Sequence, residues 1–166
     1  MAYYLSRERE QDVVAAYRRY QQYLQEHSRE FPPGAFALGT SEWYQNASDH
    51  RCPHDGRLDT LSVFQIIHQG QKPTTIMRIR VVAPYDDGFI EFAYPHVFAY
   101  QLESAGSEKA PIEWLFDEFR VTENRHLIHE IEWRFGSSNR LSRWIIEASD
   151  VQFHCIPQLP SRMKSN

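Results

Sequence analysis

The chain has 166 residues, of which 42% are hydrophobic, 14% aromatic and 24% charged. A chain of this length and apolar content buries roughly 70% of its unfolded surface, so we expect one folded domain over residues 1–166 and not a disordered chain. The 18 basic and 22 acidic residues give a net charge of −4, which argues against a nucleic-acid binder because such proteins carry a basic face.

The lack of a recognisable targeting signal and the small number of cysteines lead us to expect a cytoplasmic protein. The first ten residues, MAYYLSRERE, lack the basic flank, apolar core and cleavage site of a secretory signal. No run reaches the roughly 18 apolar residues of a membrane span. The two cysteines, Cys52 and Cys155, are too few for a disulfide framework, and whether they pair stays open. We expect a cytoplasmic protein with no membrane or nucleic-acid partner, and the sequence leaves its oligomeric state open.

A helix is predicted over about residues 7–27, because apolar side chains recur there at spacings of three and four. This stripe consists of Val13, Tyr17, Tyr20 and Leu24. Ser6 is the expected N-cap, and the FPPG sequence that follows ends the helix because proline cannot continue it. Beyond Pro33 the pattern is typical of strands.

Six strand-like segments follow, over residues 58–68, 74–83, 89–103, 112–122, 126–135 and 140–156. The third is expected to be broken or bulged at Pro95, which has no N–H for a ladder. Short turns between the segments exclude parallel crossovers. We therefore predict an α+β fold, with an N-terminal helix followed by a curved, mainly antiparallel sheet of about six strands (a half-barrel or meander). The helix would pack on one face or plug one end, the β-rich region spans about 58–156, and the tail, 157–166, is expected to be loose.

The stretch HRCPHDGRLD, residues 50–59, gathers the most chemically capable side chains of the chain. Its candidate metal ligands are His50, Cys52, His54 and Asp55, with His154 and Cys155 near the end of the last predicted strand. All of these suit zinc, but their spacing matches no established ligand pattern, so we assign no metal and no cofactor. The alternative is a PHDG turn that feeds a strand, with Asp55 capping backbone N–H groups and His54 packing under the sheet edge.

Two polar residues fall on the more apolar faces of the hairpin predicted over 112–135. These are Asp117 and His129, and a buried carboxylate needs a partner. A pair between them requires a diagonal contact, because the turn brings Phe119 nearer to His129. Such a pair is either a structural element or acid–base machinery.

The opposite face of the same hairpin carries Glu118, Glu130 and Glu132. Residues 103–132 hold eight acidic and three basic side chains. This excess indicates either a solvated sheet face or an acidic patch that attracts a basic partner protein.

The segments LGTSEWYQNASDHRCPHDGRLDTLSV and WLFDEFRVTENRHLIHEIEWRFGSSNRLSRWIIEASDVQFH resemble a pattern of small bacterial proteins, some of them similar to immunity proteins of toxin systems. The matching positions are His54, Asp55, Leu58, Leu115 to Phe119, His129 and Ile131. The resemblance implies a β-rich, non-enzymatic cytosolic protein that is a candidate for binding another protein. It carries over no catalytic residue.

Three functions follow as hypotheses. The first is a non-enzymatic protein-interaction module, immunity-like in the sense of the resemblance. The second is a metal or acid–base enzyme that uses His54, Asp55, Asp117 and His129. The third is a small-ligand carrier, because a half-barrel of aromatic residues could enclose an apolar cavity. The residues expected to line that cavity are Phe89, Phe92, Phe98, Trp114 and Trp133.

Overall fold

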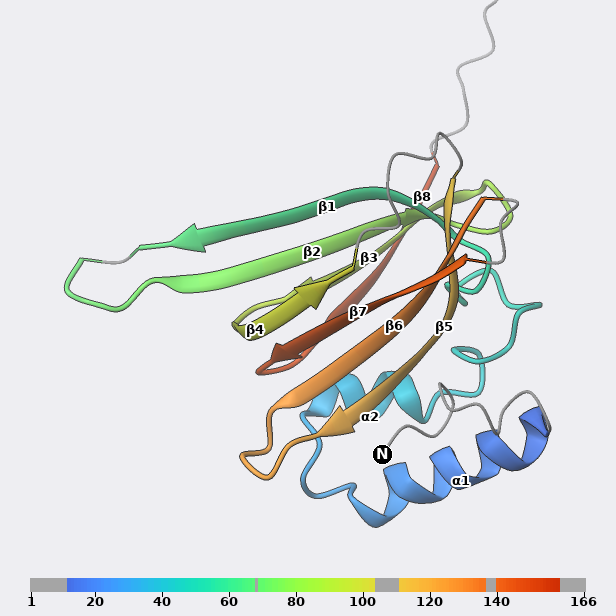
Figure 1. Cartoon of the computed structure of the whole chain (residues 1–166), viewed down its shortest axis with the longest axis horizontal. Coiled ribbons are helices and arrows are strands. Elements are labelled where there is room, and N and C mark those ends of the chain that lie inside the picture. Colours follow the sequence, from blue (N-terminus) through green and yellow to red (C-terminus); the bar gives the residue numbers. More distant parts are fainter. Residues whose placement is uncertain (1–11, 68, 104–110, 137–139, 159–166) are drawn as a thin grey trace, which may run out of the picture.

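The computed structural model describes residues 12–67, 69–103, 111–136 and 140–158. Within them the chain forms two helices and one sheet of eight antiparallel strands (Figure 1). The elements are α1 (Val13–Glu26), α2 (Pro33–Gly39), β1 (Arg57–Ile66), β2 (Thr74–Val82), β3 (Gly88–Tyr94), β4 (Val97–Leu102), β5 (Ile112–Val121), β6 (Leu127–Phe135), β7 (Arg140–Ala148) and β8 (Gln152–Pro157). Neither described helix is long and apolar enough to cross a membrane.

The predicted α+β class with a curved antiparallel sheet is confirmed, but the prediction of about six strands is wrong. The strand order is β4-β7-β6-β5-β1-β2-β3-β8. Two of the predicted strands are each divided in two. The segment 89–103 becomes β3 and β4, which are separated at Pro95, and the segment 140–156 becomes β7 and β8. Proline removes a ladder hydrogen bond, and the two bends lie together because the Ser149 N–H donates to the His96 carbonyl at 2.8 Å.

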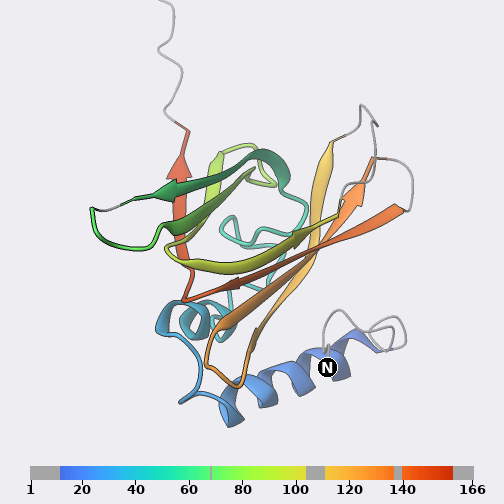
Figure 2. The same cartoon turned by 60° about the vertical axis from the view of Figure 1, so that its left-hand side comes forward.

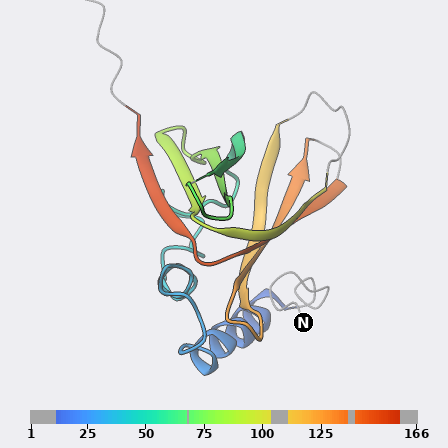
Figure 3. The same ribbon diagram turned by 90° about the vertical axis from the view of Figure 1, so that its left-hand side faces the viewer.

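The sheet has two halves, β4-β7-β6-β5 and β1-β2-β3-β8. The divided strands hold these halves together. β3 pairs with β8 from Gly88 opposite Pro157 onward, and β4 pairs with β7 from Val97 opposite Ala148 onward. One long bent strand therefore lies beside another along both halves. The ends of the sheet, β4 and β8, are each the direct continuation of a strand in the other half, which makes the sheet fold around its inner face (Figures 2 and 3).

β1 pairs with β5, its neighbour in the other half of the sheet, only at the start of β1. Arg57 lies opposite Glu113 of β5, and two backbone hydrogen bonds of 2.8 Å link Asp55 and Gly56 to Trp114. Past this junction β1 continues paired with β2 alone, over the whole length of Arg57–Ile66. The β1–β2 hairpin then extends away from the rest of the molecule (Figure 1).

The helices differ from the sequence prediction in two ways. α1 begins at Val13, and the Asp12 carboxylate caps it by accepting from the Ala15 N–H at 2.9 Å. The expected Ser6 cap and the first predicted turn lie outside the described residues. A second helix, α2, begins at Pro33, in a region where strands were expected, because proline is well suited to the first helical position. Both helices lie on one side of the sheet (Figure 1).

Each helix is fixed to the sheet by polar contacts. Asp150, in the β7–β8 bend, accepts from the Gly34 and Ala35 N–H groups at the start of α2, both at 3.0 Å. From α1, the Tyr20 hydroxyl accepts from the Phe119 N–H at 2.6 Å and donates to the Phe119 carbonyl at 3.2 Å. The Tyr23 hydroxyl accepts from the Val121 N–H at 3.0 Å. These hydroxyls bond the edge of β5 beyond the point where β1 diverges from it. α1 therefore covers a strand edge that no described strand pairs with.

Candidate functional site

A chain of buried polar side chains crosses the core between β3, β5 and β6. The Asp117 carboxylate accepts from the Tyr44 hydroxyl at 2.7 Å and from the Trp114 indole N–H at 3.1 Å. The His129 Nε2 atom lies 2.9 Å from the same carboxylate, and its Nδ1 atom lies 2.6 Å from the Tyr94 hydroxyl. All five residues are buried. The predicted Asp117–His129 contact is therefore confirmed, and it is diagonal because Phe119 stands directly opposite His129.

The donors and acceptors of this network match one another. In the tautomer that carries its proton on Nε2, His129 donates to the Asp117 carboxylate and Nδ1 is an acceptor. The Tyr94 hydroxyl then donates to Nδ1. With three donors on one carboxylate and a donor on the imidazole, every polar side-chain group of the cluster has a partner, as a buried polar network requires. This arrangement clamps three strands and the Tyr44 loop together.

The two tyrosines of the network stay protonated far into the alkaline range. Burial raises the pKa of the Tyr94 hydroxyl well above 10, and the nearby Asp117 charge raises it further. Burial also raises the pKa of Tyr44, whose hydroxyl faces the same carboxylate. Sequence reasoning missed both residues. Tyr94 shares a strand phase with Phe92, a signal that could have placed it inside, whereas no pattern marks the Tyr44 loop.

A small cavity of about 90 Å³ borders this network. Asp117, Trp114, Cys52 and His54 are among the residues that line it. The cavity has room for a few water molecules. Burial raises the pKa of the Cys52 thiol to about 11, so this cysteine is a poor nucleophile at neutral pH because little of it is thiolate.

The HRCPHDGRLD stretch forms a turn whose side chains point to separate places. His50 contacts Asp87 and stacks on Tyr85, Cys52 is buried, and the His54 ring bonds the Leu115 carbonyl. Asp55 has a positive φ of 63°. Its carboxylate accepts from the Arg134 guanidinium at 3.3 Å and not from neighbouring backbone N–H groups, which was the predicted role. The PHDG turn itself is confirmed, because the Gly56 N–H donates to the Pro53 carbonyl at 2.8 Å.

The metal and enzyme hypotheses required these residues to converge. His54 and Asp55 lie 3.7 Å apart, and His54 and Asp117 line the same cavity. His129 bonds Asp117 but is not among the residues that line this cavity. Among the described residues, no group of three or more His, Cys, Asp or Glu side chains is arranged to hold a metal ion. Cys52 and Cys155 are both free thiols, the first buried and the second exposed.

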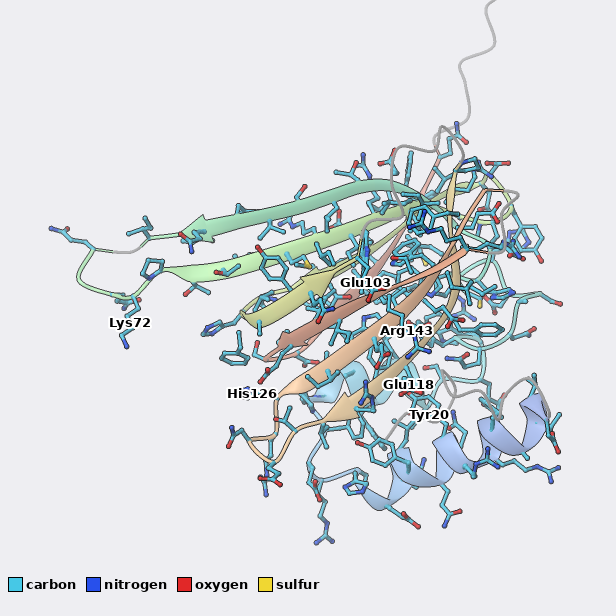
Figure 4. All side chains as sticks on the ribbon, in the orientation of Figure 1. Tyr20, Lys72, Glu103, Glu118, His126 and Arg143 are labelled. Carbon is cyan, nitrogen blue, oxygen red and sulfur yellow. The ribbon has the colours of Figure 1, made fainter. Side chains whose placement is uncertain are left out.

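The three glutamates expected on a solvent-facing acidic surface are buried instead. Glu118, Glu130 and Glu132 are between 0 and 5% exposed. Arg120 bonds Glu130 and lies 3.0 Å from Glu118, while Arg143 lies 2.9 Å from Glu130 and 3.5 Å from Glu132. Figure 4 shows Glu118 and Arg143 on the same part of the sheet. The carboxylates are thus compensated within the chain, and a basic partner at this face stays a prediction.

The aromatic lining expected for a small-ligand carrier is divided between core and surface. Phe92, Trp114 and Trp133 are fully buried, and the Trp114 ring contacts the other two, with centroids 4.7 Å from Phe92 and 5.1 Å from Trp133. Phe98, in contrast, is exposed on β4 and stacks on His126. Phe89 is half-buried and lines a separate pocket of about 300 Å³. The five rings therefore do not surround one common cavity.

The most unusual surface of the molecule is the β1–β2 arm, defined here as residues 60–67 and 69–77. Val63, Phe64, Ile66 and Ile67 on it are between 37 and 72% exposed. Successive side chains point to opposite faces of a strand, so the arm is apolar on both faces. Lys72 lies at the far end of the arm, away from the body of the molecule (Figure 4).

No family model, no curated protein and no solved structure matches this chain. The resemblance to small immunity-like bacterial proteins thus stays a prediction from its sequence motifs, and the site must be interpreted from its own geometry.

Proposed function

We propose that the protein is a non-enzymatic protein-interaction module that binds its partner through the β1–β2 arm. The observation that carries the proposal is the composition of this exposed hairpin. A quarter of the chain is charged, yet residues 60–77 contain Lys72 as their only Asp, Glu, Lys or Arg. The other charged side chains of the hairpin are Arg78 and Arg80, which lie opposite Ser62 and Thr60 toward its base. A protruding apolar surface of this kind is the usual mark of an interaction site, since water disfavours it in a free monomer.

The edge of β1 supports the same proposal. On the side away from β2, no strand of the described chain pairs with β1 beyond Arg57. Backbone N–H and C=O groups on such an edge bind an added strand from another chain, while side chains on both faces of the arm select it. Along Thr60–Ile66 this edge has no proline and no charged side chain, which are features that natural proteins use to block such pairing. The charged Asp59 and the register shift between Leu58 and Thr60 lie at the base of the strand.

The alternatives have weaker geometry. An acid–base enzyme would use Asp117 at the cavity, but three donors from the protein already occupy its carboxylate. A carrier would need an apolar cavity of about 300 Å³ or more. The cavity beside Asp117 is about 90 Å³, and a pocket of about 300 Å³ has Phe89 as the only one of the five aromatic residues expected to line a ligand cavity. An immunity-like role is one form of the proposed function, in which the bound strand belongs to a toxin.

Site-specific photo-crosslinking tests the proposal. A benzoylphenylalanine placed at Phe64, in the middle of the arm, should form a discrete covalent adduct in the native cells. The same probe at Tyr85, an exposed tyrosine on the β2–β3 turn, should not. The adduct should disappear when Val63→Lys places a charge on the β1 edge. Equal labelling from both positions, or no adduct from the arm, would rule out the arm as the binding surface.

A further inference from the structure

We infer that the partner of the arm is a second copy of this chain, which pairs antiparallel with β1 across a two-fold axis at Val63. The inference rests on the proposed function, because it names the partner of the same surface. An open strand edge binds whatever supplies another extended strand with a matching side-chain pattern. β1 is itself such a strand, so the question is whether it complements its own copy.

The register follows from the regular part of β1. The pairing with β2 shifts between Leu58 and Thr60 and is then uninterrupted to Ile66. The middle of the uninterrupted segment Thr60–Ile66 is Val63. A two-fold axis perpendicular to the sheet at this residue pairs all seven positions, and it keeps the two faces of the sheet distinct, as an isologous contact requires.

The side chains fit in this register. Val63 faces its own copy, and the small Ser62 faces Phe64 of the second copy, which leaves room for the ring. The two Phe64 rings are then diagonal neighbours at roughly 7–8 Å, a spacing that aromatic side chains bridge. On the β2 side each ring already has the Arg78 guanidinium at 5.8 Å. On the other face Leu61 lies opposite Gln65 and diagonal to Val63 of the second copy, so the two Val63 and two Leu61 side chains form one apolar strip across the contact.

The charge pattern favours a second copy. Asp59 is the only charged residue in 58–67, and it would face Ile67 of the second copy. Eight positions would separate the two Asp59 residues along the joined strands, about 27 Å at the rise of a strand. This exceeds the screening length of about 10 Å at 0.1 M salt. Asp59 is also paired with Arg80 at 2.6 Å within its own chain. Two copies of β1 can therefore pair without repulsion between like charges. A strand that carries several charges of one sign could not pair with itself in this way.

The projecting shape of the arm makes room for the contact. Because the pairing is antiparallel, the bodies of the two copies lie at opposite ends of the joined strands. The arm extends clear of the helices and of β5 to β7 (Figures 1 and 4). The tip of each arm, with Lys72, is directed toward the base of the other, where Asp59 lies.

Disulfide trapping tests the register in the purified full-length chain. In a Cys155→Ser background, which removes the exposed thiol and keeps the buried Cys52, Val63→Cys places two thiols directly opposite each other. Their Cα atoms would lie about 5 Å apart, within disulfide range. The matched control is Gln65→Cys, on the same face of the same strand. There the two thiols would be about 14 Å apart.

We expect the wild-type chain to sediment as a dimer, Val63→Cys to form a covalent dimer in mild oxidant and Gln65→Cys to form none. Val63→Lys should sediment as a monomer with an unchanged circular dichroism spectrum. A monomeric wild type, or equal crosslinking at both positions, would overturn the inference. If the chain is monomeric but the Phe64 photo-probe still captures a protein of another mass, the proposed function stands and only the identity of the partner is wrong.

Discussion

The Asp117 carboxylate is the centre of the buried hydrogen-bond network. Its carboxylate is the common acceptor for Tyr44, Trp114 and His129. Removing it leaves three buried donors without an acceptor, and each such group costs about 1–3 kcal/mol. We therefore expect Asp117→Ala to lower the free energy of unfolding by about 3 kcal/mol or more, measured by urea denaturation.

The matched control for this experiment is Asp59→Ala. Asp59 also pairs with an arginine, Arg80, but at the surface. Exposed pairs contribute about 0–1 kcal/mol, so the control should lose little stability. A loss below about 1 kcal/mol for Asp117→Ala would mean that the network does not stabilise the core in the way described.

The buried tyrosines make stability depend on alkaline pH. Burial raises the pKa of Tyr20, Tyr44 and Tyr94 above the ordinary value of 10.0. In the unfolded chain these hydroxyls lose their protons from pH 10, while the folded chain still holds them. The unfolded state then binds fewer protons, so the free energy of unfolding falls as pH rises above 10. The contribution is fully present below pH 10 and is lost as pH rises through the folded-state pKa values.

Substitution of one tyrosine isolates this effect. Tyr94→Phe should be less stable than the wild type at pH 8, because His129 loses a hydrogen bond. The difference between the two proteins should shrink between pH 10 and pH 11 in urea titrations. Tyr85→Phe, at an exposed tyrosine, should follow the wild type at every pH. A constant difference between Tyr94→Phe and wild type across this range would contradict the assignment.

At the scale of elements, α1 acts as a cover for the β5 edge. Tyr20 satisfies the Phe119 N–H and C=O groups with one hydroxyl. Tyr20→Phe keeps the ring but leaves a buried N–H without an acceptor, so we expect a loss of about 1–3 kcal/mol. Hydrogen exchange of the Phe119 amide should accelerate in the variant. Tyr23→Phe, whose hydroxyl is only partly buried, should have the smaller effect, and the reverse order would argue against the edge-covering role.

The elements that sequence patterns predicted correctly are those with a clear period. The tyrosine stripe of α1 and the alternation in β2 reflect one buried face each, and such a face leaves a direct trace in the sequence. β6 was placed by the same alternation, although both of its faces are buried over His129–Trp133. α2 escaped prediction because its seven residues are too short for a period and begin with proline. The β5 bulge between Trp114 and Phe116 brings the Trp114 indole to the Asp117 carboxylate, although residues three apart point to opposite faces of a regular strand. A bulge changes phase without a sequence mark.

At the scale of the whole molecule, the candidate site was partly foreseen. The Asp117–His129 pair followed from strand phase, since both residues stand among apolar neighbours. Tyr44 and Tyr94 join it from distant segments, and only the tertiary fold brings them there. The burial of Glu118, Glu130 and Glu132 was missed for a related reason. Strand phase shows which side chains share a face, but it does not show that Arg120 and Arg143 compensate them on that face.

The two long bent strands have a consequence for how the protein unfolds. β3–β4 and β7–β8 each belong to both halves of the sheet, and they pair with each other along their whole length. Neither half can lose its strands while the other keeps its own. The molecule therefore should lack a half-folded intermediate and melt as one cooperative unit. The contacts involved are distant in sequence, so folding should be slow compared with helical proteins of this size. The outer part of the arm, residues 60–67 and 69–76, pairs with no described strand outside its own hairpin and is the part that can open without this cooperativity.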